Sequence, residues 1–366
     1  MKKEKEVKKE KMNNRVFGTG MALVVLVLAV MAVPAMAGPN TGYFNSSANP
    51  VDSTNPIRNV IAKPGETVYV EVWFNITDPY GINPTYTFES ADINITFDSS
   101  IGNIPTVTWI PGTETIWDAY REKQRFGDSW WLGVCSAAWG DNPPYGLGPG
   151  VYPVVNLTIQ GVSPGKMDLH FSHESPRWCD MFDAIGDSYP NQSWIDAKFW
   201  CYTTFSKPLP EGWNLISLPL EPLPGNESTS KVLETVSYDA VYRYDASSHT
   251  FIDVSGGTME PGVGYFVHVT SPSTWTYNGT PYTQMNVSLE PGLNMIGWLN
   301  CTKSISEALS SIEGKYWYVA RWNATAQKFE VYNPVAPPAF NDFTTMERGE
   351  GYFISMKSAG TLTASC

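Results

Sequence analysis

Charged residues are scarce in this 366-residue chain, at 16%, whereas 42% of the residues are hydrophobic and 13% are aromatic. This composition excludes a disordered polyelectrolyte. Histidine occurs only four times, and the sequence lacks G-x-S-x-G, H-E-x-x-H and G-x-x-x-x-G-K-[ST]. The common short signatures of hydrolytic, zinc and phosphate sites are therefore missing. The 30 glycines and 28 prolines favour many short strands joined by tight turns over a helical bundle.

Basic residues are also few, with 24 Lys and Arg against 36 Asp and Glu, a net charge of −12. Seven of the basic and three of the acidic residues fall within the first 37 positions, so the remainder carries −16. A body this acidic repels phosphate backbones. Nucleic acid is thus excluded as a partner.

The only long apolar run is Met21 to Val33, which follows the Lys-rich stretch Met1 to Arg15. Ala35-Met36-Ala37 then supplies small residues at positions −3 and −1 of a signal-peptidase site. We expect residues 1–37 to be a secretory signal, cleaved between Ala37 and Gly38. The alternative is a retained membrane anchor, although 13 strongly apolar residues fall short of the ~20 that a span needs. Both interpretations place the body outside the cell.

Asn-x-Ser/Thr triplets are frequent, and chance predicts only about four of them. Strand periodicity places Asn75, Asn94 and Asn156 opposite an apolar face, where a sugar leaves the core undisturbed. The ten glycosylation candidates are Asn45, Asn75, Asn94, Asn156, Asn191, Asn226, Asn278, Asn286, Asn300 and Asn323.

Cysteine is rare, and none of the five residues forms C-x-x-C or a zinc-like pair. In an exported domain, Cys179 can pair with Cys201 or with Cys135, and we take Cys179 and Cys201 as the disulfide candidate. The odd count leaves at least one thiol free or paired between chains. Cys301 and Cys366 are assigned no partner.

Residues 38–205 are expected to form one all-β domain, with strands near 67–75, 84–97, 104–109, 151–160 and 166–173. An insertion at 111–150 is rich in aromatic residues, Gly and Pro. Aromatic rings offer flat faces at a low entropic cost, so they suit stacking on sugars or anchoring a protein. The candidate ligand-binding residues lie in or beside this insertion; they are Trp109, Trp117, Trp130, Trp131 and Trp139. The alternative is a cap that buries most of these rings.

From residue 206 onward the chain repeats itself. The block at 212–216 returns at 292–296, the block at 243–246 returns at 321–324, and the block at 258–266 returns at 345–353. Three matched blocks in one order indicate duplicated modules, 206–285 and 286–366. Each carries a helix signal; the stronger is the capping box from Ser304 to Glu307. The pairs Gly262/Gly264 and Gly349/Gly351 predict a turn that enters a strand.

Three segments resemble strands of the cohesin-like and related carbohydrate-binding β-sandwich family. They are KPGETVYVEV at 63–72, ADINITFDSSI at 91–101 and YPVVNLTIQGVSPGKMDLHF at 152–171. The resemblance implies a flattened sandwich of near nine strands that binds a partner on a sheet face or at its loops. The modules resemble repeats of microbial, often archaeal, cell-surface proteins. The expected fold class is therefore mainly β: an N-terminal cohesin-like jelly-roll β-sandwich followed by two duplicated small α+β modules.

The expected function is that of a secreted or cell-surface, non-catalytic glycoprotein that binds an extracellular protein or carbohydrate. A building block of a surface layer or sheath is the alternative, and a glycoside hydrolase with paired carboxylates is a further one. No catalytic residue and no cofactor are assigned. Structural calcium at acidic pairs such as Asp92 and Asp98 is conceivable without a supporting motif. The membrane is a partner only through an uncleaved signal segment.

Overall fold

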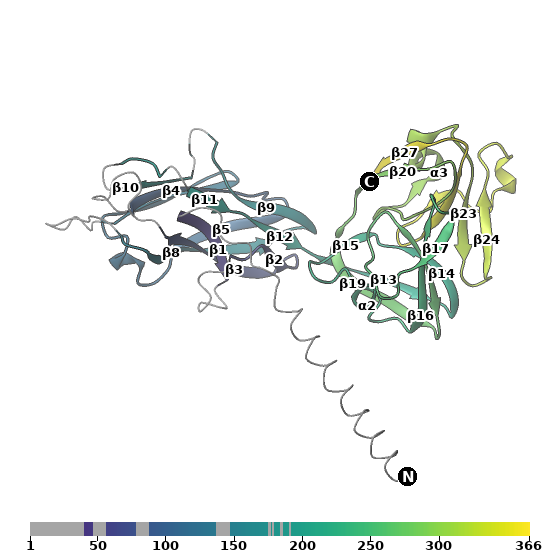
Figure 1. Cartoon of the computed structure of the whole chain (residues 1–366), viewed down its shortest axis with the longest axis horizontal. Helices are drawn as coiled ribbons and strands as arrows, with labels where there is room; N and C mark the ends of the chain where they lie inside the picture. Colours follow the sequence, from purple (N-terminus) through teal and green to yellow (C-terminus); the bar gives the residue numbers. More distant parts are fainter. Residues whose placement is uncertain are drawn as a thin grey trace, which may run out of the picture.

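The computed structural model describes residues 40–46, 56–77, 88–136, 147–174, 177, 179–183, 186–189 and 192–366. Figure 1 shows two bodies, an N-terminal β-sandwich in purple to teal and a C-terminal half in teal to yellow. The expected signal segment, residues 1–37, lies outside the described residues. Within them, no helix is long and apolar enough to cross a membrane.

The sandwich consists of two sheets packed face to face. One sheet has the strand order β11 (Gln192–Ile195), β1 (Asn40–Ser46), β3 (Thr67–Ile76), β8 (Gly150–Gly161), β5 (Gly102–Trp109). The other has the order β2 (Asn59–Ala62), β12 (Ala197–Cys201), β9 (Gly165–Phe171), β4 (Phe88–Thr96), β7 (Ser129–Cys135), β6 (Tyr120–Phe126), and β10 (Asp180–Asp183) also pairs with β4. The pairs β1–β11 and β2–β12 are parallel.

Period-two alternation builds this core. Along β3, Val70, Val72 and Phe74 are buried while their neighbours are partly exposed. The two sheets meet through rings such as Phe44 and Phe171, whose centroids lie 4.4 Å apart. Each fully buried side chain of this size contributes roughly 1.5–3 kcal/mol. The sandwich is thus stabilised by the inward face of both sheets.

The aromatic insertion contains regular strands that were not among those expected. Much of it is the β6–β7 hairpin, preceded by a short 3-10 turn, η1 (Thr113–Thr115), and β7 lies between β4 and β6. The alternating cations of β6 point across the open edge of the sandwich. Lys123 Nζ donates to the carbonyl of Val107, and Arg125 Nη1 donates to the carbonyl of Ile104. These bonds cover the free edge of β5, which protects it from further pairing.

The C-terminal half contains two units. The first unit, residues 203–281, comprises β13 (Thr203–Leu209), β14 (Gly212–Ser217), β15 (Leu220–Pro222), α2 (Thr229–Val232), β16 (Tyr238–Asp245), β17 (Thr250–Asp253), β18 (Gly264–Val269) and β19 (Ser273–Pro281). The second unit, residues 284–365, comprises β20 (Gln284–Leu289), β21 (Gly292–Ile296), β22 (Lys303–Ser304), α3 (Ile305–Ala308), η2 (Ser310–Ile312), β23 (Tyr316–Asn323), β24 (Lys328–Tyr332), η3 (Pro338–Phe340), β25 (Thr345–Met346), β26 (Tyr352–Met356) and β27 (Gly360–Ser365). The boundary expected at 205 falls inside β13.

Each unit contains one four-stranded sheet. The order is β14-β18-β16-β17 in the first unit and β21-β26-β23-β24 in the second. A second ladder pairs β13 with β19 and β20 with β27. The helices are only one turn long, so both units are mainly β rather than α+β. Ser304 caps α3 as the sequence predicts, because its hydroxyl accepts a bond from the Glu307 N–H.

The two units meet through reciprocal contacts. Ile216 of the first unit pairs with Glu350 of the second, and Ile296 of the second pairs with Val263 of the first. Backbone bonds follow the same rule, from Ser217 N–H to Gly349 C=O (3.1 Å) and from Gly297 N–H to Gly262 C=O (2.9 Å). Equivalent positions therefore exchange roles across the interface, as in a two-fold dimer.

Glycine is required at this interface. A Cβ on Gly264 would lie 2.8 Å from the carbonyl oxygen of Ile296, and one on Gly351 would lie 2.8 Å from that of Ile216. The preceding glycines, Gly262 and Gly349, have φ near +80° and form the turn. Each glycine pair thus lets a turn of one unit approach the backbone of the other.

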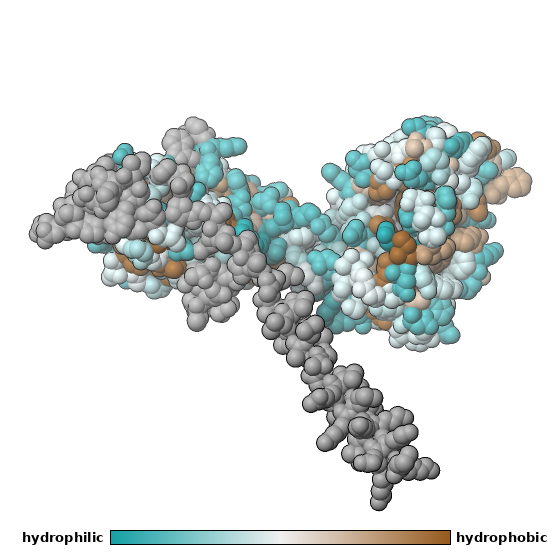
Figure 2. Space-filling model, viewed as in Figure 1, coloured by the Kyte–Doolittle hydropathy of each residue, from teal (hydrophilic) through white to brown (hydrophobic). Residues whose placement is uncertain are grey.

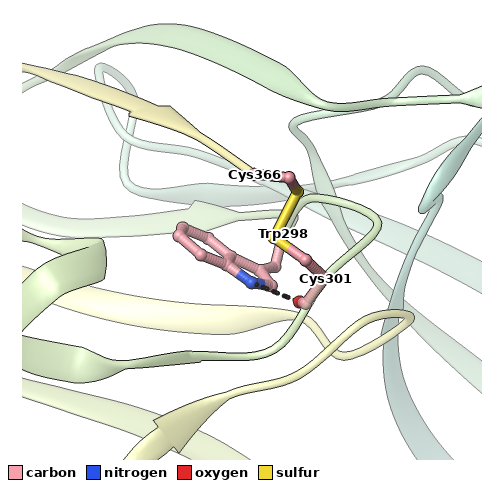
Figure 3. Close-up of a disulfide and its surroundings, with 3 residues drawn as sticks. All are labelled: Trp298, Cys301 and Cys366. Atoms are coloured by element: carbon pink, nitrogen blue, oxygen red, sulfur yellow. Dashed lines mark hydrogen bonds between the residues drawn. A yellow bond between two sulfur atoms is a disulfide. The ribbon is translucent and has the colours of Figure 1, made fainter.

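The one disulfide within the described residues joins Cys301 to Cys366 (Figure 3). It closes a loop whose ends are 65 residues apart, and the nearby Trp298 indole donates to the Cys301 carbonyl. In the first unit the corresponding place is the β15–β19 ladder, where Glu221 pairs with Thr280. The second unit has no strand equivalent to β15. A covalent bond therefore holds the chain where the first unit uses backbone pairing.

The predicted disulfide between Cys179 and Cys201 is wrong, and both thiols are free and buried. Cys201 pairs with Gly165 at one end of β9, whereas the Cys179 N–H donates to Ser172, just beyond the other end. Seven residues of extended strand separate these positions by roughly 20 Å. A disulfide needs Cα atoms within ~7 Å.

Replacing both Cys301 and Cys366 with Ser should lower the free energy of unfolding by about 4 kcal/mol, because the unfolded chain regains the entropy of a loop of this length. Urea unfolding of the oxidised protein measures it. Cys135→Ser, which removes a half-buried free thiol, is the control and should cost less than about 1 kcal/mol. Equal stability of wild type and the double variant would contradict this role of the disulfide.

Phe353→Ala should destabilise the protein by about 3–5 kcal/mol, because this ring is only 3% exposed within the cluster shared by both units. Phe329→Ala is a matched control. Its ring lies 5.9 Å from that of Phe353 but is 46% exposed, so we expect about 1 kcal/mol. Chemical denaturation of both variants checks the difference, and similar losses would show that burial does not separate them.

Candidate binding cleft

The tryptophans of the N-terminal insertion do not form a common surface. Trp117 is 1% exposed, and its indole donates to the Pro153 carbonyl. Trp109 is half-buried on β5, below the cations of Arg121 and Lys123 on β6. These rings serve the core and the sandwich edge.

Trp130 and Trp131 are neighbours on β7 and point to opposite faces. Trp130 pairs with the buried Ile95 and packs against the core, with its indole donating to the Ile104 carbonyl. Trp131 pairs with Asn94, so its ring lies on the outer face. The remaining candidate, Trp139, lies outside the described residues. Only one of the four candidate tryptophans that the structure describes faces outward, and a single ring does not form a binding platform.

The acidic pair considered for structural calcium is also separated. Asp92 lies within β4, and Asp98 lies six residues further along the same extended segment, roughly 20 Å away. The pKa of Asp92 is raised by burial and by the facing Asp180. Asp98 instead accepts bonds from the backbone and hydroxyl of Ser100.

An aromatic cleft lies instead in the C-terminal half, between the four-stranded sheets of the two units. It contains two adjoining pockets that share Phe251 and Phe266. The first, of about 350 Å³, is lined by Trp213, Tyr242, Phe251, Phe266 and Trp322. The second, of about 520 Å³, is lined by Phe251, Phe266, Leu293, Tyr318, Ala320, Phe329, Val331 and Phe353. Apolar surface of this half faces the viewer in Figure 2, in brown.

Ring contacts across the unit boundary hold the cleft open at its base. The ring of Phe266 lies 5.6 Å from that of Trp322 and 6.1 Å from that of Phe353, so the first unit packs on the second. The Phe266–Trp322 pair is edge-to-face, and pairs of this kind add about 0.5–1.5 kcal/mol beyond burial. Above this base, Phe251 stays 53% exposed and Phe329 46% exposed.

Hydrogen bonds fix the walls of the first pocket. The backbone of Trp213 both donates to and accepts from the Gln327 side chain, and the Trp322 indole donates to the Trp213 carbonyl (2.8 Å). Gln327 has a positive φ of 50°, and His249, at the matching turn of the first unit, has 56°. These strained turns place their side chains against the opposite unit. Trp213 is therefore pinned at its backbone while its ring lines the pocket.

Charges surround the cleft without entering it. Asp253 lies at the end of β17, and the Ser255 backbone N–H lowers its pKa. Near Trp213, the His268 ring is hydrogen-bonded through Nδ1 to the Asp239 carboxylate (2.6 Å). On the other face of β24, bonds from Asn323 and then Arg321 lower the pKa of Glu330. The pocket walls themselves carry no carboxylate, amide or cation.

The repeated blocks place Phe251 and Phe329 at equivalent positions of the two units, which predicts that both rings are buried. The structure instead exposes both. The signal that separates them from Phe353 is their place on the short edge strands β17 and β24, where one side of a residue has no neighbouring strand.

The glycosylation candidates differ in accessibility. Asn226, Asn278 and Asn286 are exposed, while Asn75, Asn156, Asn300 and Asn323 are half-buried. Asn45 is 2% exposed and Asn94 is 8% exposed, with the Asn94 side chain donating to the Arg177 carbonyl. The expectation that Asn94 faces solvent is wrong, because Arg177 and Cys179, which precede β10, bond to it. Asn191 lies outside the described residues.

Comparisons with known proteins give solved cohesin domains. They include a non-cellulosomal cohesin of the archaeon Archaeoglobus fulgidus (12% identity, TM-score 0.30, 44% of this chain and 90% of the cohesin). A cohesin of Clostridium acetobutylicum matches with 13% identity and a TM-score of 0.31, and the match covers 45% of this chain and 92% of the cohesin. A chain of a type I cohesin–dockerin complex of Clostridium thermocellum matches with 11% identity and a TM-score of 0.32, and the match covers 45% of this chain and 94% of that one. No family model and no curated protein matches the chain.

Proposed function

We propose that this chain is a non-catalytic binding protein of the cell exterior that holds an apolar part of a partner protein in the aromatic cleft. The observation that carries the proposal is the pair of adjoining pockets, open to solvent and lined only by aromatic and aliphatic side chains. Binding sites of this kind are concave and mostly apolar.

The lining favours a protein over a polysaccharide. Aromatic rings stack on sugars, but sugar hydroxyls also need polar partners, and the walls offer only the Tyr hydroxyls and the Trp indoles. An apolar side chain of a protein needs no such partner. Exposed aromatic residues gathered in one pocket are typical anchors of protein interfaces.

We infer further that the first and second units are two copies of one module. Three sequence blocks recur in the same order, corresponding strands have the same order in the two four-stranded sheets, and the units contact each other reciprocally. Because the sandwich resembles cohesins, we assign it a supporting role. It carries the C-terminal half, which contains the cleft, or supplements its binding.

The cleft is tested with the purified chain as bait for proteins of its native cell envelope. Phe251→Ser should lose the partner, because this ring lines both pockets, and its 53% exposure lets the variant fold. Tyr69→Ser on the sandwich is the matched control, since Tyr69 is an equally exposed ring at 54%. Circular dichroism confirms folding. Loss with Tyr69→Ser alone would move the binding site to the sandwich.

Export is tested by mass spectrometry of the protein from its native source. The chain should begin near Gly38, and glycans should occupy Asn226, Asn278 and Asn286, whose side chains reach solvent. Asn45 and Asn94 should be unmodified, because a glycan on a buried side chain would displace its neighbours. The Cys301–Cys366 bond supports the same compartment. A chain that starts at Met1 without glycans would refute export.

A further inference from the structure

The outer edge of β17 has free backbone groups beside the cleft. The Val254 N–H donates to the Val241 carbonyl (2.9 Å), so residues 250, 252 and 254 direct their backbone groups toward β16. Phe251 and Asp253 occupy the alternate positions and direct theirs outward. Within residues 192–366, no backbone or side-chain hydrogen bond reaches these outward groups.

The matching strand of the second unit has its edge covered by the chain itself. On β24, the Val331 N–H donates to Asp342 Oδ2 (2.8 Å), and the Asp342 N–H donates back to the Val331 carbonyl (3.1 Å). The Asn333 N–H donates to Asn341 Oδ1 (2.7 Å). The residues that follow η3 thus cover this edge, through the side-chain oxygens of Asn341 and Asp342 and one backbone bond.

That covering segment has no counterpart in the first unit. The offset between matching residues is 78 at Phe251 and Phe329 and 87 at Thr258 and Thr345, so the second unit is nine residues longer at this place. The shorter connection of the first unit leaves β17 open. The same edge is therefore closed by the chain itself in the second unit and left unpaired in the first.

The side chains at the edge of β17 define what an added strand would carry. Phe251 and Asp253 share one parity, so both lie on the cleft side. Phe251 reaches into both pockets, whereas Asp253 is an exposed carboxylate that the Ser255 N–H keeps oriented (2.8 Å). In the second unit the position of Asp253 is held by Val331. The charge is thus particular to the open edge.

We propose that an extended segment of the partner protein adds to the outer edge of β17 as a further strand. It places an apolar side chain against Phe251 and a Lys or Arg, two residues along, against Asp253. Main-chain bonds to Phe251 and Asp253 supply affinity, and the alternate side chains supply specificity. This rests on the proposed function, because it states how the cleft takes hold of a protein.

The probe is a heptapeptide with the sequence Thr-Val-Thr-Phe-Thr-Lys-Thr, acetylated at its N-terminus and amidated at its C-terminus. Two isomers of this peptide are compared. One is N-methylated at positions 3 and 5, and the other at positions 4 and 6. Only one of these sets can face β17 in an added strand. Fluorescence anisotropy with the full chain should show at least about a tenfold loss of affinity for one isomer. The other should stay within about threefold of the parent.

Charge is tested on the same complex with Asp253→Asn, which keeps the bond to the Ser255 N–H. The variant should bind the lysine peptide about threefold more weakly at low salt. It should bind a peptide with glutamine in place of lysine as wild type does. Equal affinity of wild type and variant for the lysine peptide would overturn the assigned contact.

The added strand is overturned if both N-methyl isomers bind alike, or if the parent peptide shows no binding at millimolar concentration. Neither result touches the proposed binding in the cleft, which fails if Phe251→Ser retains the envelope partner. Loss of that partner with Phe251→Ser, together with equal binding of both isomers, would mean that the cleft takes an apolar side chain without main-chain pairing.

Discussion

The close approach of backbone at Gly264 and Gly351 is the constraint on which the C-terminal half depends. Neither position has room for a Cβ, since a carbonyl oxygen of the opposite unit lies 2.8 Å from where it would be. This approach brings the two four-stranded sheets near enough for Phe266 to contact Phe353 and Trp322. Phe251 and Phe329, on the edge strands β17 and β24, remain exposed above this contact. The cleft is therefore a product of how the units dock, and anything that loosens the glycine contact also alters the pockets.

Exposed aromatic rings cost stability, and the rest of the half compensates for them. The first unit closes its second ladder with β15, whose Leu220 exchanges hydrogen bonds with the Tyr277 hydroxyl. The second unit uses the Cys301–Cys366 bond at the same place. Both devices lie away from the cleft and stiffen the ladders behind it. A rigid frame reduces the entropy that is lost when a partner binds to the exposed rings.

The sequence allowed much of the fold to be predicted, but less of the site. The alternation of apolar and polar residues identified the strands β3, β4, β8 and β9, and the capping box located the helix α3. The β6–β7 hairpin was missed because β6 reads as a charged loop, whereas its cations bond to carbonyls of β5, a contact distant in sequence. The disulfide was missed because connectivity depends on where strand ends meet. The cleft was missed because Phe251 and Phe353 have the same hydropathy, and only their places in the sheets decide that one is exposed.

The two units share a strand order, yet the cleft between them is not symmetric. Trp213 and Tyr242 in the first unit correspond to Leu293 and Ala320 in the second, so one pocket is walled by rings and the other is partly aliphatic. Asp342 covers the edge of β24 while the edge of β17 stays bare. A symmetric cleft would accept a ligand in two equivalent directions. With unlike walls and a single open edge, a bound segment has one favoured direction, and a duplicated fold that differs in this way can recognise a partner that is not itself symmetric.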